Sequence, residues 1–173
     1  AGPFPIGFTF PFYENLYDQI YIGSNGLVGF EDGVSSYSNQ AVPDNSTPNN
    51  IIAMWWDDQD PEHNGNIWYY YDADQDRFII TYSEIRNYQS PTGTGSLTYQ
   101  LVLYPDGKIL LQYQHMDPGT DNLEGATIGI EDAMGTDGLE VCYNQAYMHD
   151  SLAVMISAWR WLSATLFWAR PGW

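Results

Sequence analysis

The chain has 173 residues, and its 22 Asp and Glu residues against five Lys and Arg residues give a formal net charge of −17. This balance argues against binding to nucleic acids or to anionic membranes, because both depend on basic side chains that meet phosphate groups. A hydrophobic share of 44% and an aromatic share of 16% exclude a disordered acidic chain, which lacks the apolar surface for a core. The composition predicts a folded, acidic domain of a kind typical outside the cell.

Alternation of apolar and polar residues, the period of a β-strand, recurs along most of the chain, and no segment has the period of an amphipathic helix. The pattern predicts eleven strands, at Ile6–Phe12, Tyr17–Ile22, Leu27–Phe30, Ile51–Trp56, Ile67–Tyr71, Arg77–Ile85, Ser96–Tyr104, Lys108–Gln114, Ala126–Glu131, Leu139–Tyr143 and Leu152–Ile156. Many short strands without helices predict an all-β fold, an antiparallel β-sandwich that is jelly-roll-like.

Turn residues separate these strands. Ser24-Asn25-Gly26 and Pro105-Asp106-Gly107 predict tight hairpins, because Asn-Gly and Asp-Gly pairs tolerate positive φ. Two longer polar stretches, Glu31–Asn50 and Asn87–Gly95, are expected to gather at the ends of the sandwich, where binding surfaces are usually built.

The end of the chain differs in composition from the rest. Its last fifteen residues contain four of the seven tryptophans and two of the five bases, and no acid. We therefore divide the chain into a sandwich module over residues 1–157 and an aromatic tail, or the stub of a following domain, over residues 158–173. Such an apolar segment is expected to fold back as a final strand or to mediate self-association through residues 159–173.

The densest acidic cluster follows the strand that ends at Trp56. Asp57, Asp58, Asp60 and Glu62 lie within six positions, and Ca²⁺ takes six to eight oxygen ligands in loose geometry. The cluster predicts a structural calcium site, and a solvated acidic turn explains the same residues equally well. A zinc site is not expected, because His63 has no second histidine near it in the sequence.

Asp72, Asp74 and Asp76 have the opening spacing of an EF-hand loop. The loop pattern then fails, because Arg77 stands where the sharp turn needs glycine and Ser83 stands where the loop needs a bidentate Glu. We expect a plain hairpin turn here.

Enzyme chemistry has weaker support. A polysaccharide hydrolase would use paired carboxylates, with Asp57, Asp58 and Glu131 as candidates, about 5 to 9.5 Å apart across a cleft. With 22 acids in the chain, some such pair always exists, and the motif of a serine nucleophile elbow is absent.

The strongest indication of a binding site in the sequence is a run of aromatic residues. Trp68, Tyr69, Tyr70 and Tyr71 form an unbroken run within one predicted strand. Because successive side chains of a strand point to opposite faces, two of these rings face away from whichever side is buried. Exposed rings are good platforms for the apolar faces of ligands, so we expect this run to bind ligand unless a second sheet or the tail covers it.

The order and spacing of several motifs resemble a β-sandwich module of secreted bacterial proteins, which is appended to peptidases, glycan-active enzymes and adhesins. The matching segments are Gly7–Tyr13, Tyr21–Phe30, Pro48–Asp58, Gly65–Tyr69, Arg77–Ile80, Tyr104–Ile109, Ala126–Glu131 and Gly135–Leu139. The same order is more distantly similar to the nidogen-type extracellular domain. Two departures are Glu14, where the family commonly has glycine, and Trp161-Leu162-Ser163, which resembles the entry to a following immunoglobulin-like repeat.

This resemblance implies an accessory or adhesive module without a set of catalytic residues. We therefore expect a non-catalytic, secreted or cell-surface module that binds glycan or an extracellular protein surface and tethers a larger protein. The alternatives are the small polysaccharide hydrolase and a purely structural spacer.

Overall fold

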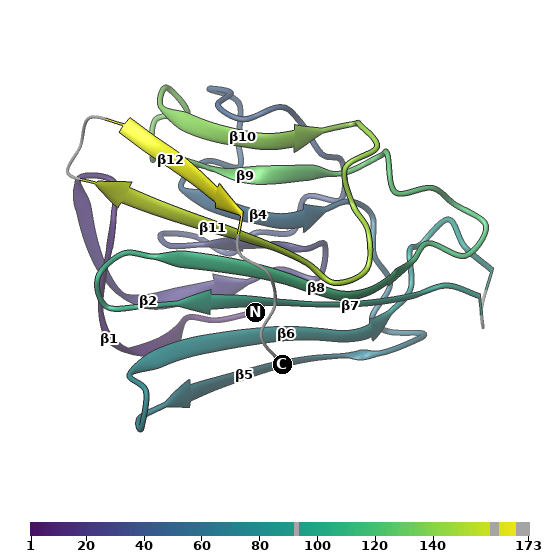
Figure 1. Cartoon of the computed structure of the whole chain (residues 1–173), viewed down its shortest axis with the longest axis horizontal. Coiled ribbons are helices and arrows are strands. Elements are labelled where there is room, and N and C mark those ends of the chain that lie inside the picture. Colours follow the sequence, from purple (N-terminus) through teal and green to yellow (C-terminus); the bar gives the residue numbers. More distant parts are fainter. Residues whose placement is uncertain (92–93, 160–162, 169–173) are drawn as a thin grey trace.

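The computed structural model describes residues 1–91, 94–159 and 163–168, and for residues 158–159 and 163–168 it describes the backbone. Within these ranges, two six-stranded antiparallel sheets pack face to face (Figure 1). Their orders are β1-β2-β3-β4-β9-β10 and β12-β11-β8-β7-β6-β5. The strands are β1 (Phe4–Phe12), β2 (Asn15–Ile22), β3 (Leu27–Gly29), β4 (Ile51–Trp56), β5 (Asn66–Asp72), β6 (Arg77–Ile85), β7 (Ser96–Leu103), β8 (Ile109–Asp117), β9 (Thr127–Glu131), β10 (Gly138–Tyr143), β11 (Leu152–Trp159) and β12 (Ser163–Trp168). The predicted antiparallel sandwich is confirmed, and the eleven predicted strands correspond in order to β1–β11.

The core lies between the two sheets, as the alternating sequence pattern requires. On β6, Phe78, Ile80 and Tyr82 are buried, whereas Ile79 and Thr81 on the other face are partly exposed. The same alternation on β7 and β8 buries one face of the second sheet against the first. Burying the aromatic side chains of this core contributes about 2 kcal/mol each to the free energy of folding.

The outer face of the first sheet is also covered. Strand β4 is buried along its whole length, because the stretch Glu31–Asn50 runs over it. Val34 packs in a second cluster with Leu27, Ile51, Ala53 and Trp56, and the Trp56 indole donates a hydrogen bond of 3.0 Å to the carbonyl of Ser36. The expectation that this stretch forms an end loop is therefore wrong for its first part, around Val34 and Ser36, which packs on the outer face of the first sheet.

The predicted tight turns are present. Gly26 and Gly107 have φ values of 73° and 84°, and each turn is closed by a backbone hydrogen bond, from Gly23 to Leu27 at 3.0 Å and from Tyr104 to Lys108 at 3.1 Å. The segment from Asp72 to Arg77 forms the hairpin between β5 and β6, and the Arg77 guanidinium lies 2.9 Å from the carboxylate of Asp72.

Part of the aromatic tail is a strand in the structure. The backbone of β12 pairs with β11 from Trp168 opposite Val154 to Ser163 opposite Trp159. The self-association expected of residues 159–173 depends on side chains outside the described residues. Over the part of the chain that the structure covers, no helix has the length and apolar character needed to cross a membrane.

Candidate binding site

The four rings of β5 divide between the two faces of the second sheet. Tyr69 faces the first sheet, where its ring centroid lies 4.4 Å from that of Phe4, and Tyr71 faces the same way, 6.1 Å from Phe8. Trp68 and Tyr70 point to the outer face and are 61% and 63% exposed. Neither the first sheet nor any described segment covers these two rings, which we call the aromatic platform.

Strand register places two rows of side chains beside the aromatic platform. Trp68 lies opposite Thr81, and the row continues through Gln100 and Gln112 on β7 and β8. The Gln100 amide donates a hydrogen bond of 2.7 Å to the Thr81 hydroxyl, which fixes its orientation. This row supplies partly exposed amide and hydroxyl groups next to an exposed indole.

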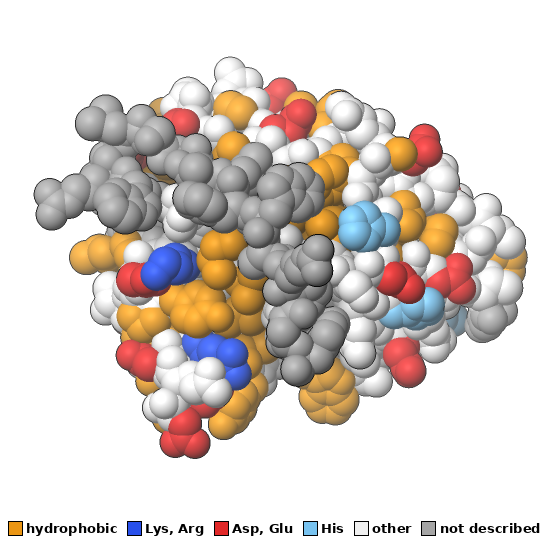
Figure 2. All heavy atoms as spheres, viewed as in Figure 1, with side chains coloured by type: hydrophobic (Ala, Val, Ile, Leu, Met, Phe, Trp, Pro, Cys, Tyr) orange, Lys and Arg blue, Asp and Glu red, His pale blue; other side chains and the backbone are white. Residues whose placement is uncertain are grey.

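The parallel row is apolar and crosses five strands. It begins at Tyr70 and continues through Ile79, Val102, Leu110 and Met155. Figure 2 shows hydrophobic side chains gathered on this face of the sandwich, beside Lys and Arg side chains. Val102 in the middle of this row is buried, so the exposed part beside the aromatic platform is Tyr70 with the partly exposed Ile79. Together with the polar row, these side chains suit a ligand that has both apolar faces and hydroxyl groups.

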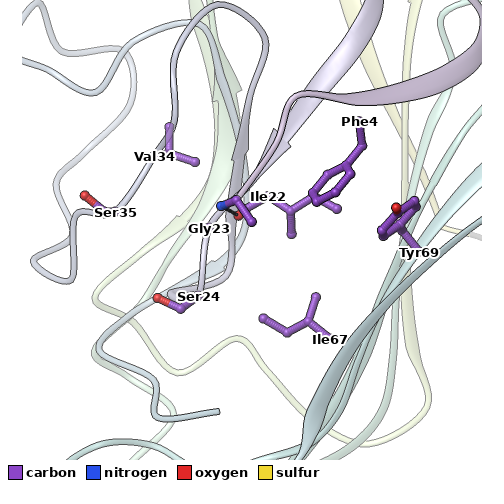
Figure 3. Close-up of a pocket in the computed structure, with 9 residues that line it drawn as sticks. Phe4, Ile22, Gly23, Ser24, Val34, Ser35, Ile67 and Tyr69 are labelled. Carbon is purple, nitrogen blue, oxygen red and sulfur yellow. Dashed lines mark hydrogen bonds between the residues drawn. The ribbon is translucent and has the colours of Figure 1, made fainter. Parts of the chain in front are cut away.

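A shallow pocket of about 320 Å³ lies on the other side of β5. Phe4, Ile22, Ile67 and Tyr69 give it apolar walls, and Ser24 lines it on the side of the β2–β3 turn (Figure 3). Its volume is at the lower end of the range for small-molecule sites. Tyr69 thus lines this pocket while its neighbours Trp68 and Tyr70 form the aromatic platform on the opposite face.

The acidic loop after β4 is held by internal hydrogen bonds. The Asp57 carboxylate accepts hydrogen bonds from the Asn87 amide at 2.9 Å and from the backbone of Asp58 at 2.8 Å. Asp60 is 6% exposed, forms an ion pair with Arg86 and lies 2.9 Å from the Nδ1 atom of His63. Burial acts to raise the Asp60 pKa, and hydrogen bonds from His63 and Arg86 bring this pKa below its usual value.

Because of these contacts, the side chains predicted to bind calcium interact with different residues and do not converge on one point. Asp57 faces Asn87, Asp60 faces Arg86, Asp58 is half-buried and Glu62 is exposed. Among the residues that the structure describes, no three His, Cys, Asp or Glu side chains lie close enough to share a metal ion. Calcium binding by this loop stays a prediction, which thermal melts in millimolar Ca²⁺ and in excess chelator would test.

The two carboxylates considered for hydrolysis lie at opposite ends of one strand pair. Glu131 pairs with Ile51 at the start of β4, whereas Asp57 follows Trp56 at its end. At about 3.4 Å per residue the five-residue step from Ile51 to Trp56 spans about 17 Å, more than the roughly 5 to 9.5 Å of a glycosidase pair. The fold does not bring Asp57 or Asp58 together with Glu131.

Glu131 is nonetheless unusual, because it is fully buried. One carboxylate oxygen accepts a hydrogen bond of 3.0 Å from the backbone of Asp44, and the other has no hydrogen-bond partner among the described residues. Burial raises the pKa of Glu131 to about 7, and it likewise raises the pKa of Asp57 to about 6. Ionisation of either carboxyl group therefore lowers the free energy of unfolding.

We expect the free energy of unfolding to fall as pH rises from about 4.5 to 7, because folded Glu131 keeps a proton that the unfolded chain has lost. The shift from the ordinary value of 4.5 to about 7 corresponds to about 3 kcal/mol. Glu131→Gln, which resembles the protonated side chain, should remove the contribution of Glu131 to this fall, while that of Asp57 stays, and raise the melting temperature at pH 8 by roughly 5 °C or more, with little change at pH 4.5. Glu124→Gln, which removes an exposed carboxylate, should leave the pH profile unchanged, and equal profiles for Glu131→Gln and wild type would contradict the account.

The sequence indicated the aromatic run but not the two rows beside it. The rows depend on the register of β6, β7 and β8, which alternation alone does not determine. Likewise, Arg86 was not recognised as the partner of Asp60, since 26 residues separate them. The pocket joins segments from the chain start, the β2–β3 turn and β5, and no local motif indicates it.

Comparison with known proteins agrees with the fold and with the motifs that follow one another along β1–β10. A family model described as NIDO related matches residues 1–158. No curated protein and no solved structure matches the chain. The match spans nearly the whole sandwich, including the β2–β3 turn, the acidic loop and β5. The chain therefore belongs to the NIDO-related family of extracellular-type modules.

Proposed function

We propose that this module is a non-catalytic extracellular binding domain that recognises glycan chains through the aromatic platform and tethers a larger secreted protein to them. The observation that carries the proposal is the exposure of Trp68 and Tyr70, at 61% and 63%, on the same face of an edge strand. Two residues of a strand separate the rings by about 7 Å. A tryptophan and a tyrosine placed this way offer two stacking surfaces to one extended ligand.

The polar row favours a glycan over an apolar ligand. Thr81 lies next to Trp68, and Gln100 and Gln112 follow it on the next two strands; all three are partly exposed, and their amides and hydroxyl donate and accept hydrogen bonds. Sugar hydroxyls need both kinds of partner. The scarcity of Lys and Arg in a chain with a net charge of −17 further favours neutral over acidic polysaccharides.

We expect Trp68→Ala and Tyr70→Ala each to weaken glycan binding at least tenfold. Burial of one ring against a ligand contributes about 1.5 to 3 kcal/mol, and 1.4 kcal/mol corresponds to a factor of ten. The measurement is affinity electrophoresis or isothermal titration on a panel of neutral polysaccharides, with and without EDTA. Release of reducing sugars from the same polysaccharides, assayed in parallel, separates binding from hydrolysis.

Matched controls are available on the same chain. Tyr37 and Tyr88 are 66% and 59% exposed and do not belong to β5, so Tyr37→Ala and Tyr88→Ala should leave affinity unchanged. Binding that persists in the Trp68→Ala/Tyr70→Ala double variant would refute the platform as the site. Failure of the whole panel to bind would refute glycan recognition.

A further inference from the structure

The open edges of the two sheets are not equally protected against pairing with another strand. An unpaired edge is usually blocked by proline, charge or a bulge. The β1 edge carries Pro5 and Pro11 and a register shift between Pro5 and Phe10, and the β10 edge carries exposed Glu140 and a register shift next to it. These two edges are therefore poor templates for an added strand.

The β5 edge has neither proline nor a register shift, and its one charged residue, Asp72, stands at its end. It is the last strand of the second sheet, and no described segment pairs with its free side. From Asn66 to Tyr71 it contains no charge and no proline, and it pairs with β6 in unbroken register over all seven residues. In a chain with a net charge of −17, the uncharged run Asn66–Tyr71 makes this an edge at which a second acidic body meets little repulsion. The strand β12, at the other end of the same sheet, also lacks charge and proline.

We propose that β5 pairs antiparallel with β5 of a second copy of this chain, around a twofold axis at Tyr69, so that the two second sheets become one continuous sheet. In an antiparallel pair, directly opposite residues point to the same face. The outer faces of the two sheets therefore lie on the same side of the continuous sheet only if the twofold axis passes through a residue, such as Trp68, Tyr69 or Tyr70. An axis between two residues would place an outer-face residue opposite an inner-face residue. The axis at Tyr69 is the one that pairs all seven residues of β5.

This register is self-complementary. It places Trp68 opposite Tyr70 of the partner subunit, and aromatic cross-strand pairs stabilise a sheet. It also places Asn66 opposite Asp72 of the partner subunit, so no like charges oppose each other. An axis at Tyr70 would instead put Trp68 opposite the partner's Asp72 and leave two residues unpaired.

The contact area fits a weak dimer. Trp68, Tyr69 and Tyr70 are 61%, 49% and 63% exposed, and rings of this kind have surfaces of about 150 to 250 Å² each. Together they offer on the order of 300 Å² per copy, and the backbone and neighbouring side chains bring the total for both copies near 1,000 Å², the lower limit for a specific interface. The dimer also joins the two aromatic platforms on one face, although self-pairing does not depend on glycan binding.

Sedimentation velocity of the full chain over a wide concentration range tests the proposal. We expect a monomer–dimer equilibrium that Trp68→Lys/Tyr70→Lys abolishes, because the register then sets lysines of the two copies opposite each other. Tyr37→Lys/Tyr88→Lys makes the same change in net charge at rings of similar exposure and should leave the equilibrium intact. A chain that stays monomeric at all concentrations, or a dimer insensitive to the β5 lysines, would overturn the proposal.

Cross-linking tests the register itself. The axis at Tyr69 places this position opposite the same position of the partner subunit, at a Cα separation of about 5 Å. The variant Tyr69→Cys can therefore form a disulfide between the two copies. In the same register, the two copies of position 70 are offset by two residues along the strands, so their Cα atoms are about 8 Å or more apart. The variant Tyr70→Cys should therefore not cross-link. A cross-linked dimer with Tyr69→Cys alone, reversed by reductant, supports the axis, and cross-linking of Tyr70→Cys without Tyr69→Cys would overturn it. The native Cys142 is buried, and peptide mass spectrometry of the linked species distinguishes it from the introduced cysteine.

Discussion

Gly26→Ala should destabilise the module by about 4 kcal/mol or more and lower its melting temperature by roughly 10 °C or more. Gly26 has a φ of 73°, which side-chain-bearing residues rarely adopt. A Cβ there would lie 2.0 Å from the carbonyl oxygen of Trp55 and 2.5 Å from the amide of Gln59. The first of these atoms is backbone in a buried strand and has no room to move.

The conformation of Gly26 matters because the β2–β3 turn is docked onto the end of β4. The Gly26 carbonyl accepts hydrogen bonds from the backbone of Met54 at 2.8 Å and of Trp55 at 3.2 Å. A shift of the turn to relieve the alanine would break both. Gly33→Ala is the matched control, since its Cβ would meet only Tyr21, at 3.8 Å. Equal melting temperatures for the two variants would contradict this account of the turn.

Arg86→Met should cost about 3 to 5 kcal/mol at neutral pH. Arg86, directly after β6, and Asp60 are 7% and 6% exposed and form an ion pair. The Arg86 guanidinium also donates a hydrogen bond to the carbonyl of Ser90. Removing the cation leaves the Asp60 carboxylate buried, with the His63 ring as its remaining side-chain contact among the described residues. The free energy of unfolding, from urea denaturation, measures the loss.

An exposed ion pair provides the control. Lys108 pairs with Asp106 in the β7–β8 turn, and their side chains are 49% and 54% exposed. Lys108→Met should therefore cost less than about 1 kcal/mol. If both variants lose the same free energy of unfolding, burial does not explain how strongly the Asp60–Arg86 pair stabilises the fold.

The fold was predictable because strands and turns are determined by residues that are close together in the sequence. Alternation over Arg77–Ile85 gives the strand and its buried face, and the Asn25-Gly26 and Asp106-Gly107 pairs give the turns. The same reasoning predicted that the run from Trp68 to Tyr71 would split between two faces, as its contacts with Phe4 and Phe8 confirm.

Longer-range features were not predictable in this way. Val34 and Ser36 lie in a polar, Ser- and Asn-rich stretch, and nothing local indicates that they cover Trp56. The burial of Glu131 depends on the backbone of Asp44, 87 residues away. The polar row beside Trp68 requires the mutual register of four strands, which only tertiary packing fixes.

The central claim, that the outer face of β5 binds glycan, is tested most directly by NMR mapping of a polysaccharide that binds in the panel. The indole N–H of Trp68 is a reporter on the aromatic platform, and Trp55, which is fully buried in the core, is an internal reference. We predict that saturating ligand shifts the resonances of Trp68, Tyr70, Thr81 and Gln100 and leaves the indole signal of Trp55 in place. Shifts confined to the acidic loop from Asp57 to Asn64, or to the pocket beside Phe4, with Trp68 unchanged, would contradict the claim.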